Sequence, residues 1–362
     1  MTGILPDREI EDLAASGALR FAAPPVAGQV QPASLDLRLG AVAYRVRASF
    51  LPGPEHSVAD KLDRLALHRF DLADGAVLET GCVYIVPVLE ALALAPDVSA
   101  SANPKSSTGR LDVFTRLIVD RARAFDQVPA GYAGPLYLEI SPRTFPVLVR
   151  TGSRLSQIRF RRGATALDDE ALRLLHAEAR LASGRPHFAN GLAVSIDLEG
   201  GPGGLVGFRA KRHTGVVDVD RTGGYDVEEF WEPLRRRGRA ELVLDPDQFY
   251  ILVSAEAVHV PPGYAAEMVP FDPLMGEFRV HYAGFFDPGF GHDSAGGGGS
   301  RAVLEVRSHE VPFILEHGQT IARLVYERLG AAPRRLYGAE LGSHYQAQGL
   351  KLSKHFRVPE GA

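Results

Sequence analysis

The stretch Leu136-Tyr137-Leu138-Glu139 places a single carboxylate at the end of an apolar run, and Ala302-Val303-Leu304-Glu305 repeats the pattern 166 positions later. Two further landmarks keep the same offset, Pro146-Val147-Leu148 with Pro312-Phe313-Ile314 and Gly152 with Gly318. A constant offset between separated landmarks is hard to obtain by chance and indicates an internal repeat. The sequence therefore predicts two copies of one structural unit.

Each copy is predicted to consist mainly of β-strands. Short apolar runs such as 83–89 and 249–253 alternate with turn-forming residues, and the chain holds 38 glycines and 25 prolines. Short strands between frequent turns are typical of a barrel or jelly roll. Helical spacing of apolar residues occurs at 7–16, with Asp7 as the expected N-cap, and at 168–183, with Gly184 as the expected stop. We expect an all-β chain with a few short helices.

The repeat divides the chain into segments. We expect a first repeat at 1–163, a helical connector at 164–186, a second repeat at 187–335 and a C-terminal segment at 336–362. Gly184-Arg185-Pro186 supports the boundary after the connector, because glycine and proline interrupt regular structure. With 362 residues, the chain is long enough for two cores of ordinary size.

Composition narrows the expected setting. The formal net charge of −4 gives no sign of a nucleic-acid or membrane partner, so an anionic ligand must be attracted by local cations. Cys82 is the single cysteine, which excludes an intramolecular disulfide and fits a reducing cytoplasm. The first residues do not resemble a signal peptide, and no apolar run approaches the roughly 18 residues needed to span a membrane. We expect a cytoplasmic protein.

The segment Lys105-Ser106-Ser107-Thr108-Gly109-Arg110 has the composition of a phosphate-binding turn. It combines three hydroxyls, a glycine and two cations, and a guanidinium can bind two phosphate oxygens at once. Ser-Ser-Thr-Gly also suits an ordinary turn, but the flanking cations favour phosphate binding. At the repeat offset, the second copy has Asp272 opposite Ser106 and Gly276 opposite Arg110. Only the first copy is therefore expected to supply this motif.

Taken together and in this order, the motifs resemble the dCTP deaminase branch of the dUTPase-like superfamily. The family's Arg-Ser-Ser-x-x-Arg phosphate motif is similar to 105–110, and its Asp-Pro-Gly-aromatic-x-Gly hairpin is similar to 287–291, which precedes Leu304-Glu305. Tyr337 and 344–349 look like the family's C-terminal nucleotide lid. The resemblance implies tandem dUTPase-like repeats of the β-clip, or distorted jelly-roll, fold. It also implies a hydrolase acting on a cyclic amidine C–N bond, which converts dCTP to dUTP and ammonia in pyrimidine deoxynucleotide synthesis.

The resemblance also implies roles for individual residues. A glutamate acts as general acid and base, Ser106 helps to hold the attacking water, and Arg110 stabilises charge beside it. The sequence leaves both Glu139 and Glu305 open as the catalytic residue. Glu139 lies in the same copy as the phosphate motif, whereas Glu305 lies in the same copy as the clearer hairpin and the lid. Either glutamate could instead be an ion-paired carboxylate. The expected substrate-binding residues are Lys105, Ser107, Ala122, Asp126, Ala283, Asp287, Tyr337, His344 and Gln348.

No metal site is predicted in the protein itself. The zinc deaminases carry an H-x-E…P-C-x-x-C signature, which is absent here, and one cysteine cannot supply it. The expected chemistry is therefore zinc-independent, with Mg²⁺ entering only on the nucleotide triphosphate. The resemblance implies dCTP and dUTP as ligands, dTTP as a candidate inhibitor, and a homo-oligomeric assembly.

Two other functions stay open at this point. A dUTP diphosphatase, or an enzyme that performs both steps, would hold a water with an aspartate at the α-phosphate, and Asp126 with Tyr132 fits that chemistry. A non-catalytic nucleotide-binding paralogue is the second alternative, although the intact pair of Ser106 and Arg110 argues against it. The glutamate in the strand after the hairpin favours deamination.

Overall fold

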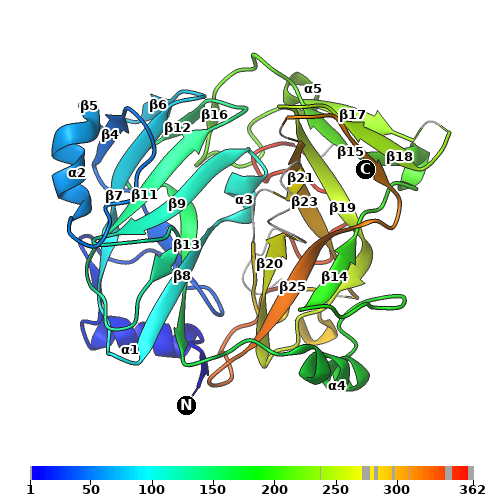
Figure 1. Cartoon of the computed structure of the whole chain (residues 1–362), viewed down its shortest axis with the longest axis horizontal. Coiled ribbons are helices and arrows are strands. Elements are labelled where there is room, and N and C mark those ends of the chain that lie inside the picture. The colour runs from blue at the N-terminus through cyan, green and yellow to red at the C-terminus, as the bar shows by residue number, and fades with distance from the viewer. Residues whose placement is uncertain are drawn as a thin grey trace.

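The computed structural model describes residues 2–236, 238–270, 284–295, 298–308, 310–338 and 345–357, together with the backbone of 278–280. The chain is mostly β-strands with a few short helices, as the sequence predicts. We call residues 2–163 the first half, 187–335 the second half and 336–357 the tail. Figure 1 shows the two halves side by side, with α3 (Ser106–Gly109) at the boundary between them.

The first half is built on three sheets. The first has the order β1-β13-β8-β10, with β3 also paired to β13: β1 (Gly3–Ile4), β13 (Arg154–Arg162), β8 (Val98–Pro104), β10 (Gln127–Val128) and β3 (Leu35–Arg38). The second has the order β5-β4-β7-β11-β9, with β2 on β7: β5 (Ala66–Asp71), β4 (Val42–Val46), β7 (Val83–Ala93), β11 (Ala133–Pro142), β9 (Val113–Val119) and β2 (Leu19–Phe21). The third joins β12 (Val147–Val149) to β6 (Ala76–Leu78) and to β16 (Val217–Asp218), which comes from the second half.

The second half also has three sheets. One has the order β14-β25-β20-β22: β14 (Leu192–Ser195), β25 (Thr320–Arg328), β20 (Tyr264–Pro270) and β22 (Phe285–Phe286). The next has the order β17-β15-β19-β23-β21: β17 (Trp231–Arg235), β15 (Leu205–Ala210), β19 (Phe249–Val258), β23 (Ser300–Ser308) and β21 (Phe278–Val280). The last pairs β18 (Glu241–Leu244) with β24 (Phe313–Glu316).

The strands of the two halves correspond at the offset found in the sequence. β7 and β19, β8 and β20, and β13 and β25 each begin 166 residues apart. β11, which carries Glu139, pairs with β7, and β23, which carries Glu305, pairs with β19 in the same antiparallel manner. The two glutamates therefore occupy corresponding places in their sheets.

The helices differ in detail from the sequence expectations. α1 (Asp7–Ala15) begins after Pro6 rather than at an Asp7 N-cap, because the Asp7 carboxylate accepts from the backbone amides of Arg8 and Arg334 instead. α4 (Asp169–Ala179) has Asp168 as its N-cap but ends well before Gly184, since Arg180 takes a left-handed φ of +38°.

Three other helices were not expected. These are α2 (Val58–Leu65), α3 and α5 (Val227–Phe230). α2 begins with a capping box in which the side chains of Ser57 and Asp60 each accept from the other's backbone amide. Short 3-10 turns occupy Pro202–Gly204 and Asp293–Ala295.

One aromatic cluster joins the halves and the tail. Phe145 of the first half lies with its ring centre 5.4 Å from that of Trp231, 5.5 Å from that of Phe230 and 6.4 Å from that of Phe356 in the tail. Phe145, Trp231, Phe230 and Phe356 are all buried and belong to one continuous core. Aromatic rings contribute large buried areas, so this cluster fixes the second half and the tail against the first half.

Phe145→Ala is expected to lower the free energy of unfolding by about 3–5 kcal/mol, because it removes a fully buried ring and leaves a cavity. Urea denaturation measures the change. The control is Leu174→Ala on α4, whose side chain is 64% exposed and whose loss should change the same quantity by less than about 0.5 kcal/mol. Similar losses from the two substitutions would contradict the account of this cluster.

Candidate functional site

A cavity of about 340 Å³ lies between the two halves and the tail. The first half contributes Ser106 and Arg110, the second half contributes Asp287 and Glu305, and the tail contributes Gln348. Pieces that are separated by as many as 242 positions in the sequence thus meet at one place. The cavity is lined by polar groups to a degree that suits a charged ligand rather than an apolar one.

The phosphate motif forms the turn that faces this cavity. The backbone amides of Thr108 and Gly109 both donate to the carbonyl of Lys105, at 2.8 and 2.9 Å, and close the short helix α3. Ser106 and Arg110 are four residues apart and therefore lie on the same side of the turn. Lys105, Ser106, Ser107 and Arg110 of the motif all line the cavity.

Arg110 is held by the tail. Its two terminal nitrogens donate to Oε1 of Gln348 at 3.2 and 3.1 Å, and Nη1 also donates to the carbonyl of Lys351 at 2.8 Å. The guanidinium carbon lies 4.0 Å from the centre of the Tyr345 ring. The buried Nε has no hydrogen-bond partner among the described residues, and it lies 3.8 Å from Oε1 of Glu305. Buried donors are rarely left unpaired, and this Nε belongs to a residue that lines the cavity.

Glu305 is a buried carboxylate in the lining of the cavity. It lies on β23 with 5% of its surface exposed. Burial raises the pKa of Glu305 to about 7, and the charge of Arg110 opposes that rise. A carboxyl with a pKa near neutral exchanges a proton readily at physiological pH, which is what a general acid and base requires.

Glu139 occupies the corresponding place in the first half but has different surroundings. Its Oε1 accepts from Nε and Nη2 of Arg116, at 3.0 and 2.5 Å. The guanidinium of Arg116 in turn lies 3.5 Å from the centre of the Phe125 ring. Glu139 is not among the described residues that line the cavity. Of the two glutamates that the sequence leaves open, Glu305 is the one that the structure brings to Ser106 and Arg110.

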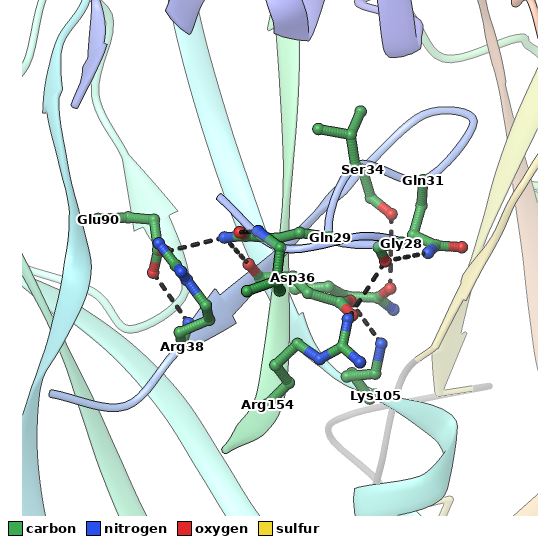
Figure 2. A network of polar contacts seen from close by, with 12 residues as sticks. Gly28, Gln29, Gln31, Ser34, Asp36, Arg38, Glu90, Lys105 and Arg154 are labelled. Carbon is green, nitrogen blue, oxygen red and sulfur yellow. Dashed lines mark hydrogen bonds and ion pairs between the residues drawn. The ribbon is translucent and has the colours of Figure 1, made fainter. Parts of the chain in front are cut away.

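Three cations gather at the other end of the cavity. Nζ of Lys105 donates to Oδ1 of Asp36 at 2.5 Å, and Arg154 lies 3.3 Å from the second oxygen of the same carboxylate (Figure 2). Lys354 of the tail lines the cavity with them, as does Asp220. Burial lowers the pKa of Lys354, and the charges of Lys105 and Arg154 lower it further. Positive charge therefore exceeds negative charge at this end.

A buried network stands behind Asp36. Figure 2 shows Arg38 and Gln29 converging on Glu90, with Gln29 also reaching the backbone of Asp36. Arg38 donates through Nε and Gln29 through Nε2 to Oε1 of Glu90, both at 2.8 Å. Because Arg38 and Glu90 are paired, neither is left as an uncompensated buried charge, and their contacts with the backbone of β3 help to fix the strand that carries Asp36.

The hairpin aspartates lie in different environments. Asp287 lines the cavity, and burial raises its pKa against the effect of Arg159. Asp126 accepts from the Leu117 amide at 2.7 Å in the first half, away from the described lining of the cavity, and burial raises its pKa to about 7. The carbonyl of Ala122 accepts from the amide of Gly53 at 3.0 Å.

The other expected binding residues are placed as follows. Lys105, Ser107, Tyr337 and Gln348 line the cavity. Ala283, His344 and the residues opposite the phosphate motif, Asp272, Pro273 and Gly276, lie outside the described residues.

The sequence expectations missed Arg154 and Lys354. Neither belongs to a recognisable motif. Lys354 lies ten positions beyond His344 and reaches the cavity because the tail folds back over α3. There, Oγ of Ser353 donates to the carbonyl of Ser107 at 2.8 Å. The one available signal was the basic character of the tail itself.

The described residues form neither a metal cluster nor a membrane span. No group of three or more His, Cys, Asp or Glu residues in this part of the chain is arranged to hold a metal ion. No helix within it is long and apolar enough to cross a membrane.

Comparison with known protein families identifies both halves. The N-terminal domain of the 2′-deoxycytidine 5′-triphosphate deaminase (DCD) family matches residues 1–164, and the C-terminal domain of that family matches residues 168–356. The chain belongs to the dCTP deaminase family. This confirms the resemblance indicated by the motifs.

Individual dCTP deaminases show the same relationship. A crystal structure of 2′-deoxycytidine 5′-triphosphate deaminase from Agrobacterium tumefaciens is 67% identical, with a TM-score of 0.88, over 91% of this chain and 99% of its own. The dCTP deaminase of Halorubrum lacusprofundi is 34% identical over 160 residues, which are 43% of this chain and 76% of that protein. A dUMP-forming dCTP deaminase of Methanoculleus marisnigri is 33% identical over 163 residues, which are 44% of this chain and 80% of that protein.

Glu305→Gln is expected to change how stability depends on pH. A carboxyl whose pKa rises on folding stabilises the protein below its unfolded pKa of 4.5, and this contribution is lost as pH rises through about 7. Glutamine does not titrate, so the free energy of unfolding of the variant, relative to wild type, should increase by up to roughly 3 kcal/mol from pH 4.5 to 8. Urea unfolding at a series of pH values measures this difference.

The control is Glu316→Gln at an exposed position. The free energy of unfolding of this variant, relative to wild type, should stay constant over the same pH range. A constant difference for Glu305→Gln as well would show that burial does not raise the pKa of Glu305.

Proposed function

We propose that this chain hydrolyses dCTP to dUTP and ammonia, as a hydrolase acting on the cyclic amidine C–N bond, with Glu305 as the general acid and base. The observation that carries the proposal is the buried Glu305 carboxyl, with a pKa of about 7, beside the unpartnered Nε of Arg110. Membership of the dCTP deaminase family supports the reaction. A cytoplasmic location and a homo-oligomeric assembly remain predictions from the sequence and the resemblance.

In the proposed reaction Glu305 moves every proton. Its carboxylate accepts a proton from water as the water oxygen forms a bond to C4 of cytosine, and it delivers that proton to N3. It then takes the second proton of the added hydroxyl and gives it to the amino group, and the C4–N bond breaks to release ammonia and leave uracil. Ser106 holds the water, and Arg110 stabilises the negative charge that develops on its oxygen. A pKa near 7 suits both directions of transfer.

The charged end of the cavity is proposed to bind the triphosphate. Lys105, Arg154 and Lys354 line the cavity close to one another, and Ser106 and Ser107 line it as well. Mg²⁺ is proposed to arrive on the triphosphate rather than on a protein site. The zinc-independent route remains a prediction from the missing signature.

The nucleoside end is proposed to be held by the hairpin and the tail. Asp287 is proposed to accept a hydrogen bond from the sugar 3′-hydroxyl, and Tyr337 and Gln348 to close over the ligand. The base-binding role of Ala283, the lid role of His344 and inhibition by dTTP remain predictions.

A dUMP-forming enzyme, which would also cleave the triphosphate, is the second candidate, because one relative carries that name. Asp126 and Tyr132, the residues expected to serve a diphosphatase, do not support it: the Tyr132 hydroxyl donates to the carbonyl of Pro135 at 2.7 Å, and neither residue is among those described as lining the cavity. An assay that follows both ammonia and pyrophosphate from dCTP separates the candidates. Ammonia alone supports deamination, pyrophosphate with ammonia supports the dUMP-forming reaction, and neither product supports a non-catalytic protein.

Glu305→Gln is expected to lower kcat for ammonia release from dCTP by roughly 10²–10⁴-fold, the range that general acid–base catalysis supplies. The matched control is Glu139→Gln, which changes the corresponding residue of the first half and should keep kcat within a few fold of wild type. Circular dichroism establishes that both variants are folded. If Glu139→Gln abolished turnover and Glu305→Gln did not, the assignment of the two glutamates would be reversed.

Lys354→Ala is expected to raise KM for dCTP by roughly 10- to 100-fold, since charge-assisted hydrogen bonds contribute about 1.5–3 kcal/mol. Inhibition constants for dCMP should change by less than about threefold, because dCMP lacks the outer phosphates. Lys354→Arg should restore most of the affinity, and Lys211→Ala at an exposed site serves as the control. An equal loss for dCTP and dCMP would mean that Lys354 does not contact the outer phosphates.

A further inference from the structure

Arg159 of β13 is fully buried and reaches from the first half into the second. Its Nη1 donates to the carbonyl of Ala266 at 3.0 Å. Its Nη2 donates to the carbonyl of Phe286 at 3.3 Å and to Oδ1 of Asp287 at 3.0 Å. The guanidinium carbon lies 4.0 Å from the centre of the Phe285 ring. One side chain of the first half thus binds two strands of the second half, β20 and β22, and the residue that follows β22.

The residues that Arg159 binds form one wall of the cavity. Phe285, Phe286 and Asp287 all line it. Phe285 and Phe286 form β22, a strand only two residues long that pairs with β20 through Ala266 and Glu267, and Asp287 follows it directly. A strand this short has few backbone hydrogen bonds to set its position, so the contacts from Arg159 are a large share of what fixes this wall.

Arg159 also acts against the effect of burial on the pKa of Asp287. Burial raises the pKa of that carboxyl, and Arg159 is the largest influence against the rise. Lys105 acts in the same direction as Arg159, and Asp36 acts in the opposite one. On its other side, Arg159 lies 3.6 Å from Glu327 of β25. The guanidinium is therefore balanced by two carboxylates, as a buried charge must be.

We infer that Arg159 is a positioning residue for the substrate: its hydrogen bonds to Asp287 and to the carbonyl of Phe286 hold the Asp287 carboxyl group at the cavity wall, so that this group can accept a hydrogen bond from a sugar hydroxyl. This inference rests on the proposed function. It also means that the first half, which supplies the phosphate motif, fixes the position of the cavity wall that the second half forms beside the nucleoside. A lysine at 159 would keep the charge but could not bind Ala266, Phe286 and Asp287 at once, because only a guanidinium offers a planar fork of donors.

A double-mutant cycle tests the coupling of Arg159 to Asp287. Arg159→Gln should raise KM for dCTP roughly tenfold or more, with kcat changed less than about threefold, and Arg159→Lys should lie between this variant and wild type. In the Asp287→Asn background, Arg159→Gln should change KM by less than about threefold, because the carboxylate it acts through is gone.

Arg161→Gln is the matched control. Arg161 lies two residues further along β13 and contacts Glu327 at 3.4 Å, but it is not among the described residues lining the cavity. The KM of the Arg161→Gln variant for dCTP should stay within about twofold of the wild-type value. If Arg159→Gln raises KM equally in both backgrounds, its role is structural and the inference is overturned. If wild type does not release ammonia from dCTP, the proposed function fails instead, so the two failures are distinguishable. Should Arg159→Gln not fold, the same cycle with Arg159→Lys decides the question.

Discussion

The cavity depends on the burial of one carboxylate and one guanidinium side by side at the boundary between the two halves. In a low-dielectric interior such a pair normally closes to full hydrogen-bond contact, since each charge is costly alone. Here Glu305 and Arg110 stay 3.8 Å apart, because the tail binds the guanidinium through Gln348 and the carbonyl of Lys351. Glu305 therefore receives too little compensation for its burial, and its pKa rises to about 7. The proton-exchanging property of the site follows from the docking of three separate parts of the chain.

The two halves of the duplicated chain contribute different residues to the cavity. Both halves keep a glutamate at the same place in a central strand, but their neighbours differ. In the first half Arg116 binds Glu139 directly and stacks on Phe125, so the carboxylate has a close counter-charge of its own. In the second half, Glu305 lies beside the guanidinium of Arg110 from the first half, which already donates to Gln348 and to the carbonyl of Lys351. The phosphate motif is present only in the first half. One chain thus brings the motif of one copy together with the glutamate of the other, whereas the glutamate of the first copy is paired with Arg116.

The sequence predicted the fold well, because a repeat offset survives in strands whose positions are set by alternation and turns. It also predicted Ser106 and Arg110, whose joint placement depends on local spacing within one turn. It could not choose between Glu139 and Glu305, since that choice depends on which half docks against α3. It missed Arg154 and Lys354 for a related reason: Lys354 reaches Lys105 only through the return path of the tail. The end of α4 was misplaced because apolar spacing continues to Ala182, whereas the backbone turns at Arg180.

The tail contacts both the residues of the cavity and the core that holds the two halves together. Phe356 packs in the aromatic cluster with Phe145 and Trp231, Ser353 bonds to the backbone of the phosphate motif, and Gln348 fixes Arg110. Removing the tail from these contacts would free the guanidinium to move toward Glu305, and a closer counter-charge would lower the pKa of that carboxyl. It would also take Lys354 away from the cations that it faces. Docking of the tail therefore does more than cover the cavity: the same contacts hold the guanidinium of Arg110 beside Glu305 and bring Lys354 close to Lys105 and Arg154.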